Sequence, residues 1–238
     1  MSTTSTAPSR RASRESGKST RQSLLRAATE VFAEHGETAS VAQICQRANA
    51  FPNQVTYYFG SKEQLFVEVA CAAVLRAGRH AEEAAANATT VREYTHALIG
   101  SLLGSEARSV EMFTTAMLLV ARRPDLREHI SETLHTLHER GGDALMATLV
   151  RTGWQLRAPI DVEAKAFWSA TFGLVVQKAA TGAEFGYTLE ESVAVIFTNL
   201  QIPENVLDQP LSGLETPRAS KLARGSSTSG GSALKGTS

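Results

Sequence analysis

Hydrophobic side chains recur every three or four positions along most of the chain, and this spacing predicts helices. Strand-like alternation of apolar and polar residues is absent from the sequence, and glycine and proline fall mostly where helices should stop. The front of the chain is predicted to form four helices, over residues 19–35, 40–48, 52–59 and 62–86. Five more are predicted over residues 90–103, 109–121, 124–152, 161–182 and 188–200. We therefore expect an all-α protein of about nine helices.

The ends of the front helices have residues that typically start and stop helices. Ser19 or Thr20 can cap the first helix, and Gly36 suits the position just after it. Pro52 fits the first turn of the third helix, where its missing N–H breaks no hydrogen bond. Ser61 can cap the fourth helix. Because the second and third helices are short and separated by a tight turn, the front is predicted to contain a helix-turn-helix.

A helix-turn-helix near basic residues is typical of proteins that read DNA, because the major groove admits one α-helix. In the motif at about residues 41–60, Asn53 and Gln54 can each pair with adenine through two hydrogen bonds, and the Thr56 methyl group can contact thymine. Free N–H groups at the starts of the second and fourth helices can bind phosphate. The residues expected to bind DNA are Ser40, Gln43, Arg47, Phe51, Pro52, Asn53, Gln54, Thr56, Tyr57, Tyr58 and Lys62.

The charge of the chain is distributed unevenly. The 238 residues include 24 Lys and Arg and 24 Asp and Glu, and a net charge of zero taken alone argues against a nucleic-acid partner. Residues 1–62 carry eight basic and four acidic side chains, however, whereas residues 63–214 carry twelve basic and nineteen acidic ones. The last stretch, 215–238, has a net charge of +3. A cationic front on an anionic body is expected if only the front contacts a polyanion.

Three segments of the front are distinctive: AATEVFAEHG, SVAQICQRANA and QVTYYFGSKEQLF. Together they resemble the N-terminal domain of the TetR (tetracycline-repressor-type) family of bacterial transcriptional regulators, over residues 18–78. The resemblance implies that the third helix enters the major groove and that Lys62 contacts phosphate. It also implies a ligand pocket within helices 4–7 and a dimer made by helices 8 and 9. Asn53, Thr56 and the pair Phe51-Pro52 depart from the usual family residues, which affects the expected base preference but not the docking.

The composition divides the chain into four parts: a disordered basic arm (1–17), the DNA-binding domain (18–78), an effector-binding and dimerisation domain (79–202) and a disordered Pro/Ser/Gly-rich tail (203–238). The basic residues at the front end either keep that end soluble or contact the DNA backbone or minor groove. These residues are Arg10, Arg11, Arg14 and Lys18. Arg21, Arg26 and Arg47 fit solvated helix residues better than base readers.

Large apolar side chains gather in the rear half, where they either form the core or line an apolar ligand pocket. The residues expected to line an effector pocket are Cys71, Leu75, Phe113, Met117, His138, Trp168 and Phe172. Their character favours a small apolar or aromatic effector over a highly charged one. The last two helices either form half of a twofold dimer interface or only cover their own core. The residues expected at such an interface are Phe167, Leu174, Val193, Ile196, Phe197 and Leu200.

Three further features allow alternative interpretations. His135 and His138, close to Glu132 and Glu139, could hold zinc or nickel, but a solvated or partly buried helix face explains them better, so we expect no metal and no cofactor. Cys71 could be a redox sensor, but core packing is the simpler explanation for it, as for Cys45. The adjacent glycines at 141–142 indicate close helix packing or a slight kink, with a signalling hinge as the alternative.

These patterns predict a sequence-specific DNA-binding transcriptional regulator, and the family resemblance implies a dimeric repressor that a small-molecule effector releases from double-stranded operator DNA. The alternative is a DNA-binding regulator without a small-molecule effector, controlled by its abundance or by a protein partner. No enzyme is expected, because the sequence shows no catalytic triad order, paired carboxylates, phosphate loop or metal motif. Two cysteines without metal spacing and the lack of a long apolar run favour the bacterial cytoplasm, with no membrane partner.

Overall fold

The computed structural model describes the backbone of residues 10–211 and the side chains of residues 17–182 and 186–211. Within that range the chain forms helices and turns, with one isolated β-bridge between Thr90 and Pro210 and no strand. The helices are α1 (Arg10–His35), α2 (Val41–Ala48), α3 (Pro52–Phe59), α4 (Lys62–Ala85), α5 (Val91–Leu103), α6 (Ala107–Ala121), α7 (Arg127–Thr152), α8 (Ile160–Phe185), α9 (Leu189–Leu200) and α10 (Glu204–Leu207), with short 3₁₀ turns η1 (Gly36–Thr38) and η2 (Pro124–Leu126). The all-α prediction is confirmed, and α2 to α9 begin and end within three residues of their predicted bounds.

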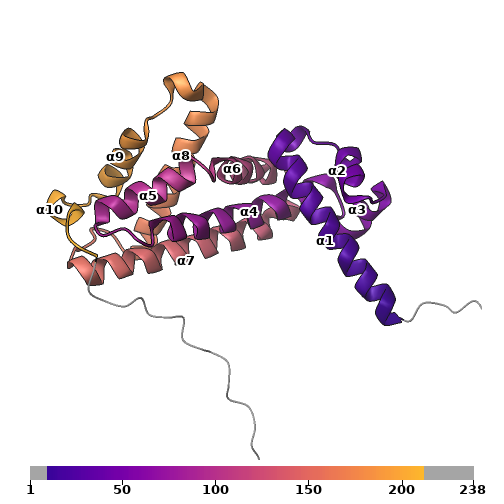
Figure 1. Cartoon of the computed structure of the whole chain (residues 1–238), viewed down its shortest axis with the longest axis horizontal. Helices are drawn as coiled ribbons and strands as arrows, with labels where there is room; N and C mark the ends of the chain where they lie inside the picture. The colour runs from indigo at the N-terminus through magenta and orange to yellow at the C-terminus, as the bar shows by residue number, and fades with distance from the viewer. Residues whose placement is uncertain (1–9, 212–238) are drawn as a thin grey trace, which may run out of the picture.

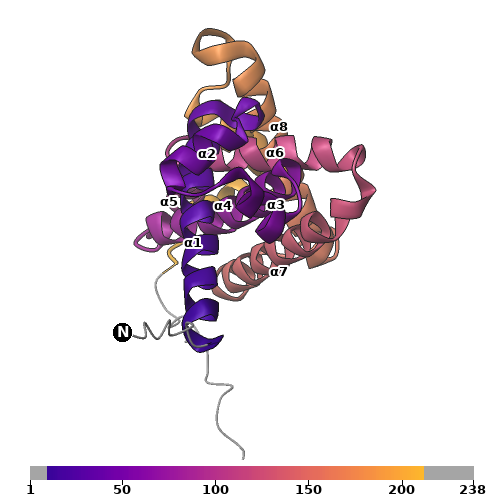
Figure 2. The same ribbon diagram turned by 90° about the vertical axis from the view of Figure 1, so that its right-hand side faces the viewer.

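The helices form two groups joined by α4 (Figure 1). Helices α1, α2 and α3 pack together at one end of the molecule, and the start of α4 completes their core. There the rings of Phe32 and Phe66 meet edge to face, with 5.0 Å between centroids, and Ile44, Val55 and Phe59 are buried around them. Helix α4 then continues into the rear bundle, where it packs on α5, α6 and α7. Figure 2 views the molecule from the front group, with the bundle behind it.

The rear bundle depends on a close approach between α7 and α8. A Cβ atom added at Gly141 would lie 3.4 Å from the indole nitrogen of Trp168 and 3.5 Å from the Cβ of Ala164, whereas one added at Gly142 would meet nothing within 4 Å. The indole N–H of Trp168 donates to the carbonyl of Leu137 at 2.9 Å, which fixes the ring across this contact. Gly141 therefore lies at the contact between α7 and α8, where an added Cβ would make ordinary van der Waals contacts, so this packing does not by itself require glycine.

The described chain is ordered beyond the predicted limits at both ends. Helix α1 starts at Arg10, so the arm prediction is wrong for residues 10–17, where Arg, Ala and Glu favour helix. The tail prediction is wrong for residues 203–211. Val206, Leu207 and Leu211 are buried there, and the Leu211 N–H donates to the Thr89 carbonyl at 2.7 Å. Burial of these three apolar side chains, in a segment that packs on α5, is enough to order it. The rest of the predicted arm and tail, residues 1–9 and 212–238, lies outside the described residues.

Candidate functional site

The start of α2 is fixed by a reciprocal cap. The Ser40 hydroxyl accepts a hydrogen bond from the Gln43 N–H at 3.2 Å, and the Ser40 N–H donates to Gln43 Oε1 at 2.8 Å. Both side chains remain exposed beside the free N–H groups of the first turn. At the other end, Asn49 adopts the left-handed conformation (φ 50°, ψ 50°), and the Ala50 N–H closes the helix on the Cys45 carbonyl at 2.9 Å. This left-handed residue begins the turn that leads into α3.

Helix α3 presents one side to solvent and buries the other. Val55 and Phe59 lie in the core, while Pro52, Asn53, Thr56 and Tyr57 are exposed. Phe51, just before the helix, is 73% exposed, and Tyr57 is 81% exposed. Rings as large as these are unusually exposed. Phe51 and Tyr57 lie on either side of the polar residues Asn53 and Thr56 in the sequence. The exposed face of α3 has the width and chemistry that a major groove accepts.

Gln54 lies at the edge of that face and has a structural partner. Its side-chain oxygen accepts a hydrogen bond from the Phe51 N–H at 2.9 Å, so it caps α3. The side-chain NH₂ group retains its two donor hydrogens. The cap restricts how the Gln54 amide can turn toward adenine, although its oxygen has a second lone pair, whereas Asn53 is exposed without such a constraint.

Two cations predicted at the DNA surface hold the domain together. Lys62 Nζ donates to the carbonyls of Glu37 at 2.8 Å and Ala39 at 3.2 Å, which ties the start of α4 to the segment before α2. The Arg47 guanidinium forms two hydrogen bonds with the Glu34 carboxylate, at 2.6 and 3.2 Å. Through these bonds Arg47 lowers the pKa of Glu34. Tyr58 is half-buried, and its ring lies edge to face with Tyr57, 4.9 Å between centroids.

Arg21 makes contacts that no sequence pattern indicated. Its guanidinium contacts both oxygens of the Glu68 carboxylate, at 2.6 and 2.9 Å, and lies 4.8 Å from the centroid of the Phe59 ring. Arg21 therefore connects α1, α3 and α4. Its partner Glu68 is 47 positions away in the sequence, so no local pattern could identify the pair. Of the four basic residues considered at the front end, Lys18 is the one whose side chain the structure describes, and it is exposed.

A cavity of about 80 Å³ lies between α4, α5, α7, α8 and α9. Of the residues predicted for an effector pocket, Leu75 and Trp168 line it. Phe113 and Phe172 lie next to it, in a row of rings that ends on Trp168 with centroid distances of 5.7 and 5.4 Å. Met117 is partly buried against the core. The sequence did not single out most of the other lining residues, among them Glu82, Tyr94, Thr95, Leu98, Arg140, Leu145 and Thr148.

The other predicted pocket residues, and the residues weighed as metal or redox sites, lie elsewhere. Cys71 is buried, its thiol lies 3.7 Å from the His129 carbonyl, and burial raises the pKa of this thiol as it does that of Cys45. Burial lowers the pKa of His138, and the exposed His135 lies 3.2 Å from Glu139. In the part of the chain whose side chains are described, no group of three His, Cys, Asp or Glu residues is placed to hold a metal ion.

The residues predicted for a dimer interface are divided between the cavity and the core. Phe167, Ile196 and Leu200 line the cavity. Leu174 and Val193 are buried within the chain, and Phe197 is partly buried. Val176 on α8 and Tyr187, in the segment between α8 and α9, face outward and are 47% and 40% exposed. A search of the described residues finds no helix long and apolar enough to span a membrane.

A capped helix-turn-helix at one end of a helical bundle, joined to a cavity-containing rear by a shared helix, defines a class of protein: DNA-binding transcriptional regulators with a two-part helical chain. Comparisons with known proteins identify the family. A family model described as bacterial regulatory proteins of the tetR family matches residues 24–69, and one described as bacterial transcriptional repressor C-terminal matches residues 91–197.

Solved structures agree with these matches. A crystal structure from Rhodococcus sp. RHA1, described as a candidate transcriptional regulator, is 63% identical, with a TM-score of 0.75, over 80% of this chain and 99% of that chain. The fold is also similar to that of the fatty acid degradation regulator FadR from Bacillus halodurans, at 19% identity, a TM-score of 0.58 and coverage of 82% and 96%. The multidrug binding protein EbrR, complexed with imidazole, has 23% identity, a TM-score of 0.55 and coverage of 77% and 91%. No curated protein matches the sequence significantly.

The chain belongs to the TetR family and is a transcriptional regulator with a DNA-binding helix-turn-helix.

Proposed function

We propose that this TetR-family regulator acts in the bacterial cytoplasm as a dimeric repressor, released from its operator when a small molecule enters the cavity. The single observation that carries the proposal is the position of α4. Its first half packs in the DNA-binding domain, where Lys62 and Glu68 make their contacts, and its second half lines the cavity with Leu75, Gly78 and Glu82. A ligand that repacks this wall therefore acts on a helix that the DNA-binding domain shares.

A second connection runs from α6 to α1. Arg108 Nε donates to the Ala33 carbonyl at 2.9 Å, in the last turn of α1, while its Nη1 contacts Glu111 at 3.1 Å. A cation at the C-terminal end of a helix is favourable for the helix dipole. Two rear helices thus hold the DNA-binding domain, and an effector that favours one arrangement of them over another changes DNA affinity by its differential affinity for the two states. The name of the C-terminal family model, a transcriptional repressor, supports the sign of regulation.

In this proposal a twofold dimer presents two copies of α3 to successive major grooves, about 34–36 Å apart. The outward faces of α8 and α9, with Val176 and Val195, and Tyr187 between the two helices pair with their copies, since Leu174 and Val193 already pack inside the chain. Small molecules also bind the structurally similar EbrR, whose crystal structure is a complex with imidazole.

Base contacts come from the exposed side of α3, chiefly Asn53 and Thr56, with the ring of Tyr57 and the N-terminus of α2 at the phosphates. Lys62 and Arg47 stabilise the packing of the DNA-binding domain. They also lie close enough to its surface to contact phosphate groups.

The test begins with selection of bound sequences from random DNA, followed by affinity measurements on the selected site by fluorescence anisotropy. Affinity is expected to fall steeply with salt, with a slope of about −0.9 per phosphate contact. Asn53→Ala should cost about tenfold or more at one base position. Gln46→Ala, at an exposed site on α2 outside the predicted set, is the matched control and should change little. A flat salt response, or an unchanged preferred sequence in Asn53→Ala, would contradict the proposal.

Dimerisation and release need separate measurements. Sedimentation should show a dimer, and Val176→Glu should produce monomers that lose operator affinity. If no small molecule that binds the cavity releases operator DNA, the regulator works without an effector, and its abundance or a protein partner sets its activity.

A further inference from the structure

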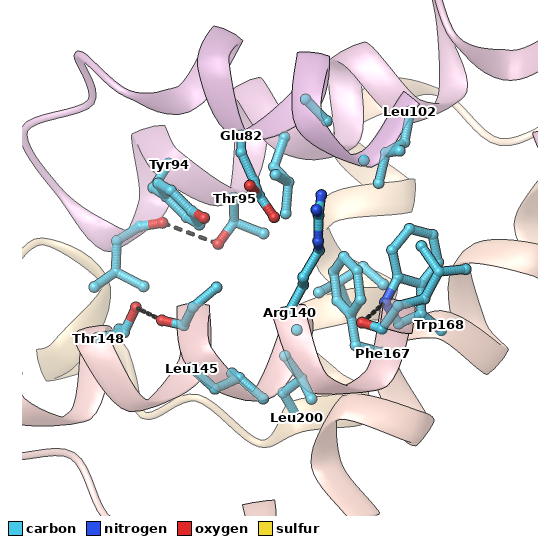
Figure 3. Close-up of a pocket in the computed structure, with 18 of the residues that line it drawn as sticks. Glu82, Tyr94, Thr95, Leu102, Arg140, Leu145, Thr148, Phe167, Trp168 and Leu200 are labelled. Atoms are coloured by element: carbon cyan, nitrogen blue, oxygen red, sulfur yellow. Dashed lines mark hydrogen bonds between the residues drawn. The ribbon is translucent and has the colours of Figure 1, made fainter. Parts of the chain in front are cut away.

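The cavity is apolar over most of its wall but has two opposite charges facing inward. Glu82 lies on α4 and Arg140 on α7, and Figure 3 shows both side chains directed into the space between the helices. The remaining lining is formed mainly by leucine, valine, isoleucine and aromatic side chains, including Tyr94, Phe167 and Trp168.

Most other polar groups on the wall already have partners. The Thr95 hydroxyl donates to the Val91 carbonyl at 2.9 Å, the Thr148 hydroxyl to the Ala144 carbonyl at 3.0 Å, and the Trp168 N–H to the Leu137 carbonyl at 2.9 Å. None of the hydrogen bonds drawn in Figure 3 joins Glu82 to Arg140. These two side chains, with the Tyr94 hydroxyl beside them, are the polar groups of the wall that remain available to a ligand.

The two opposite charges restrict the net charge that a ligand can carry. A carboxylate only accepts hydrogen bonds and a guanidinium only donates them. An anionic ligand would be attracted to Arg140 but repelled by Glu82, and a cationic ligand would be attracted to Glu82 but repelled by Arg140. A neutral hydroxyl group can donate to the first and accept from the second. Glu82 also has a raised pKa because of burial, partly offset by Arg140 and the more exposed Arg79, while Asp143 and Glu83 act in the same direction as burial.

From this arrangement we infer that the cavity binds a neutral, largely apolar molecule with a single hydroxyl group, a phenol above all, and that the hydroxyl lies between Glu82 and Arg140. The aromatic side chains of the same wall provide faces and edges for a ring. This inference rests on the proposed function, since it names the class of effector for the proposed cavity.

Four compounds that differ only in their polar group test the inference: 4-butylphenol, 4-butylbenzoate, 4-butylbenzylammonium and butylbenzene. At neutral pH the phenol is uncharged, because phenols have a pKa near 10. Both tryptophans of the chain, Trp154 and Trp168, line the cavity, so intrinsic fluorescence reports binding, and calorimetry gives an independent value. The phenol should bind the full-length protein at least about tenfold more tightly than each of the other three, since hydrogen bonds to charged groups are strong.

Variants identify the side chains responsible. Glu82→Gln should bring the benzoate to within about threefold of the phenol, because repulsion of the anion is removed, and Arg140→Gln should do the same for the ammonium compound. Thr148→Val is the matched control on the same wall and should leave the order of affinities unchanged, because its hydroxyl is already bonded to its own helix. Circular dichroism checks that each variant is folded.

The inference is wrong if a charged compound binds the wild type more tightly than the phenol, if none of the four binds, or if neither variant alters the order. Failure of the proposed function would look different. In that case the phenol binds in the expected order but leaves operator affinity unchanged. Conversely, release of DNA by the benzoate alone would overturn the neutral-ligand inference and support effector control.

Discussion

Arg21 is predicted to stabilise the DNA-binding domain through two separable contacts. The first is the two-bond ion pair with Glu68, whose side chains are 41% and 28% exposed, and the second is the guanidinium 4.8 Å from the Phe59 ring centroid. Partly exposed ion pairs contribute about 0.2–1 kcal/mol. A cation over an aromatic ring contributes about 0.5–1 kcal/mol at exposed sites. Arg21→Met, which keeps an apolar stem of similar length, should therefore lower the free energy of unfolding by about 1–2 kcal/mol.

A series of variants separates the two contacts. Arg21→Lys retains the charge but replaces the planar guanidinium, whose Nη2 contacts both carboxylate oxygens, by a compact ammonium group, so its loss should be about half as large. Arg21→Met combined with Glu68→Gln should reveal a coupling of about 0.5–1 kcal/mol, whereas a change to Met at the exposed Arg26 on the same helix should have almost no effect. Urea unfolding followed by circular dichroism at one fixed protein concentration measures these values. A coupling of zero, or equal losses for Arg21→Met and Arg26→Met, would refute the reasoning.

Three further predictions concern a cap, a packing contact and a buried acid. Ser40→Ala should lower stability by about 1 kcal/mol through loss of the α2 cap, measured by urea unfolding. Gly142→Ala should raise stability by about 1 kcal/mol because its Cβ meets open space, and Gly141→Ala should raise it at least as much because its Cβ makes ordinary van der Waals contacts with Trp168 and Ala164; a loss of stability at either position would contradict this reasoning. Burial raises the pKa of Glu82 above its ordinary 4.5, so folding takes up a proton and stability falls as pH rises through that window. The stability of Glu82→Gln relative to wild type should therefore increase as the pH is raised above about 4.5 in unfolding curves; a constant difference would refute it.

The sequence was sufficient to predict helix ends because the signals for them are local. The cap at Ser40, the first-turn position of Pro52 and the cap at Ser61 each depend on neighbours within three or four residues. The same locality explains why α3 was placed correctly and why its exposed side included Asn53 and Thr56.

Partners distant in the sequence could not be predicted in this way. Arg47 was assigned to the DNA surface, yet its carboxylate partner lies on α1. The cavity posed a similar difficulty, because α8 and α9 are apolar on more than one side. Phe167 and Ile196 were expected to meet a second chain, whereas the rotation of their helices turns them toward the cavity. Helical periodicity identifies a face but not the neighbour that covers it.

The length of α4 has a mechanical consequence. Its 24 residues form one continuous helix, about 36 Å long at 1.5 Å per residue. If α4 moves as a rigid body, a tilt of about 5° at the cavity displaces its other end by about 3 Å. This displacement is about the length of a hydrogen bond. A ligand hydroxyl group bound between α4 and α7 would therefore need to tilt α4 only slightly to move α3 out of register with the bases.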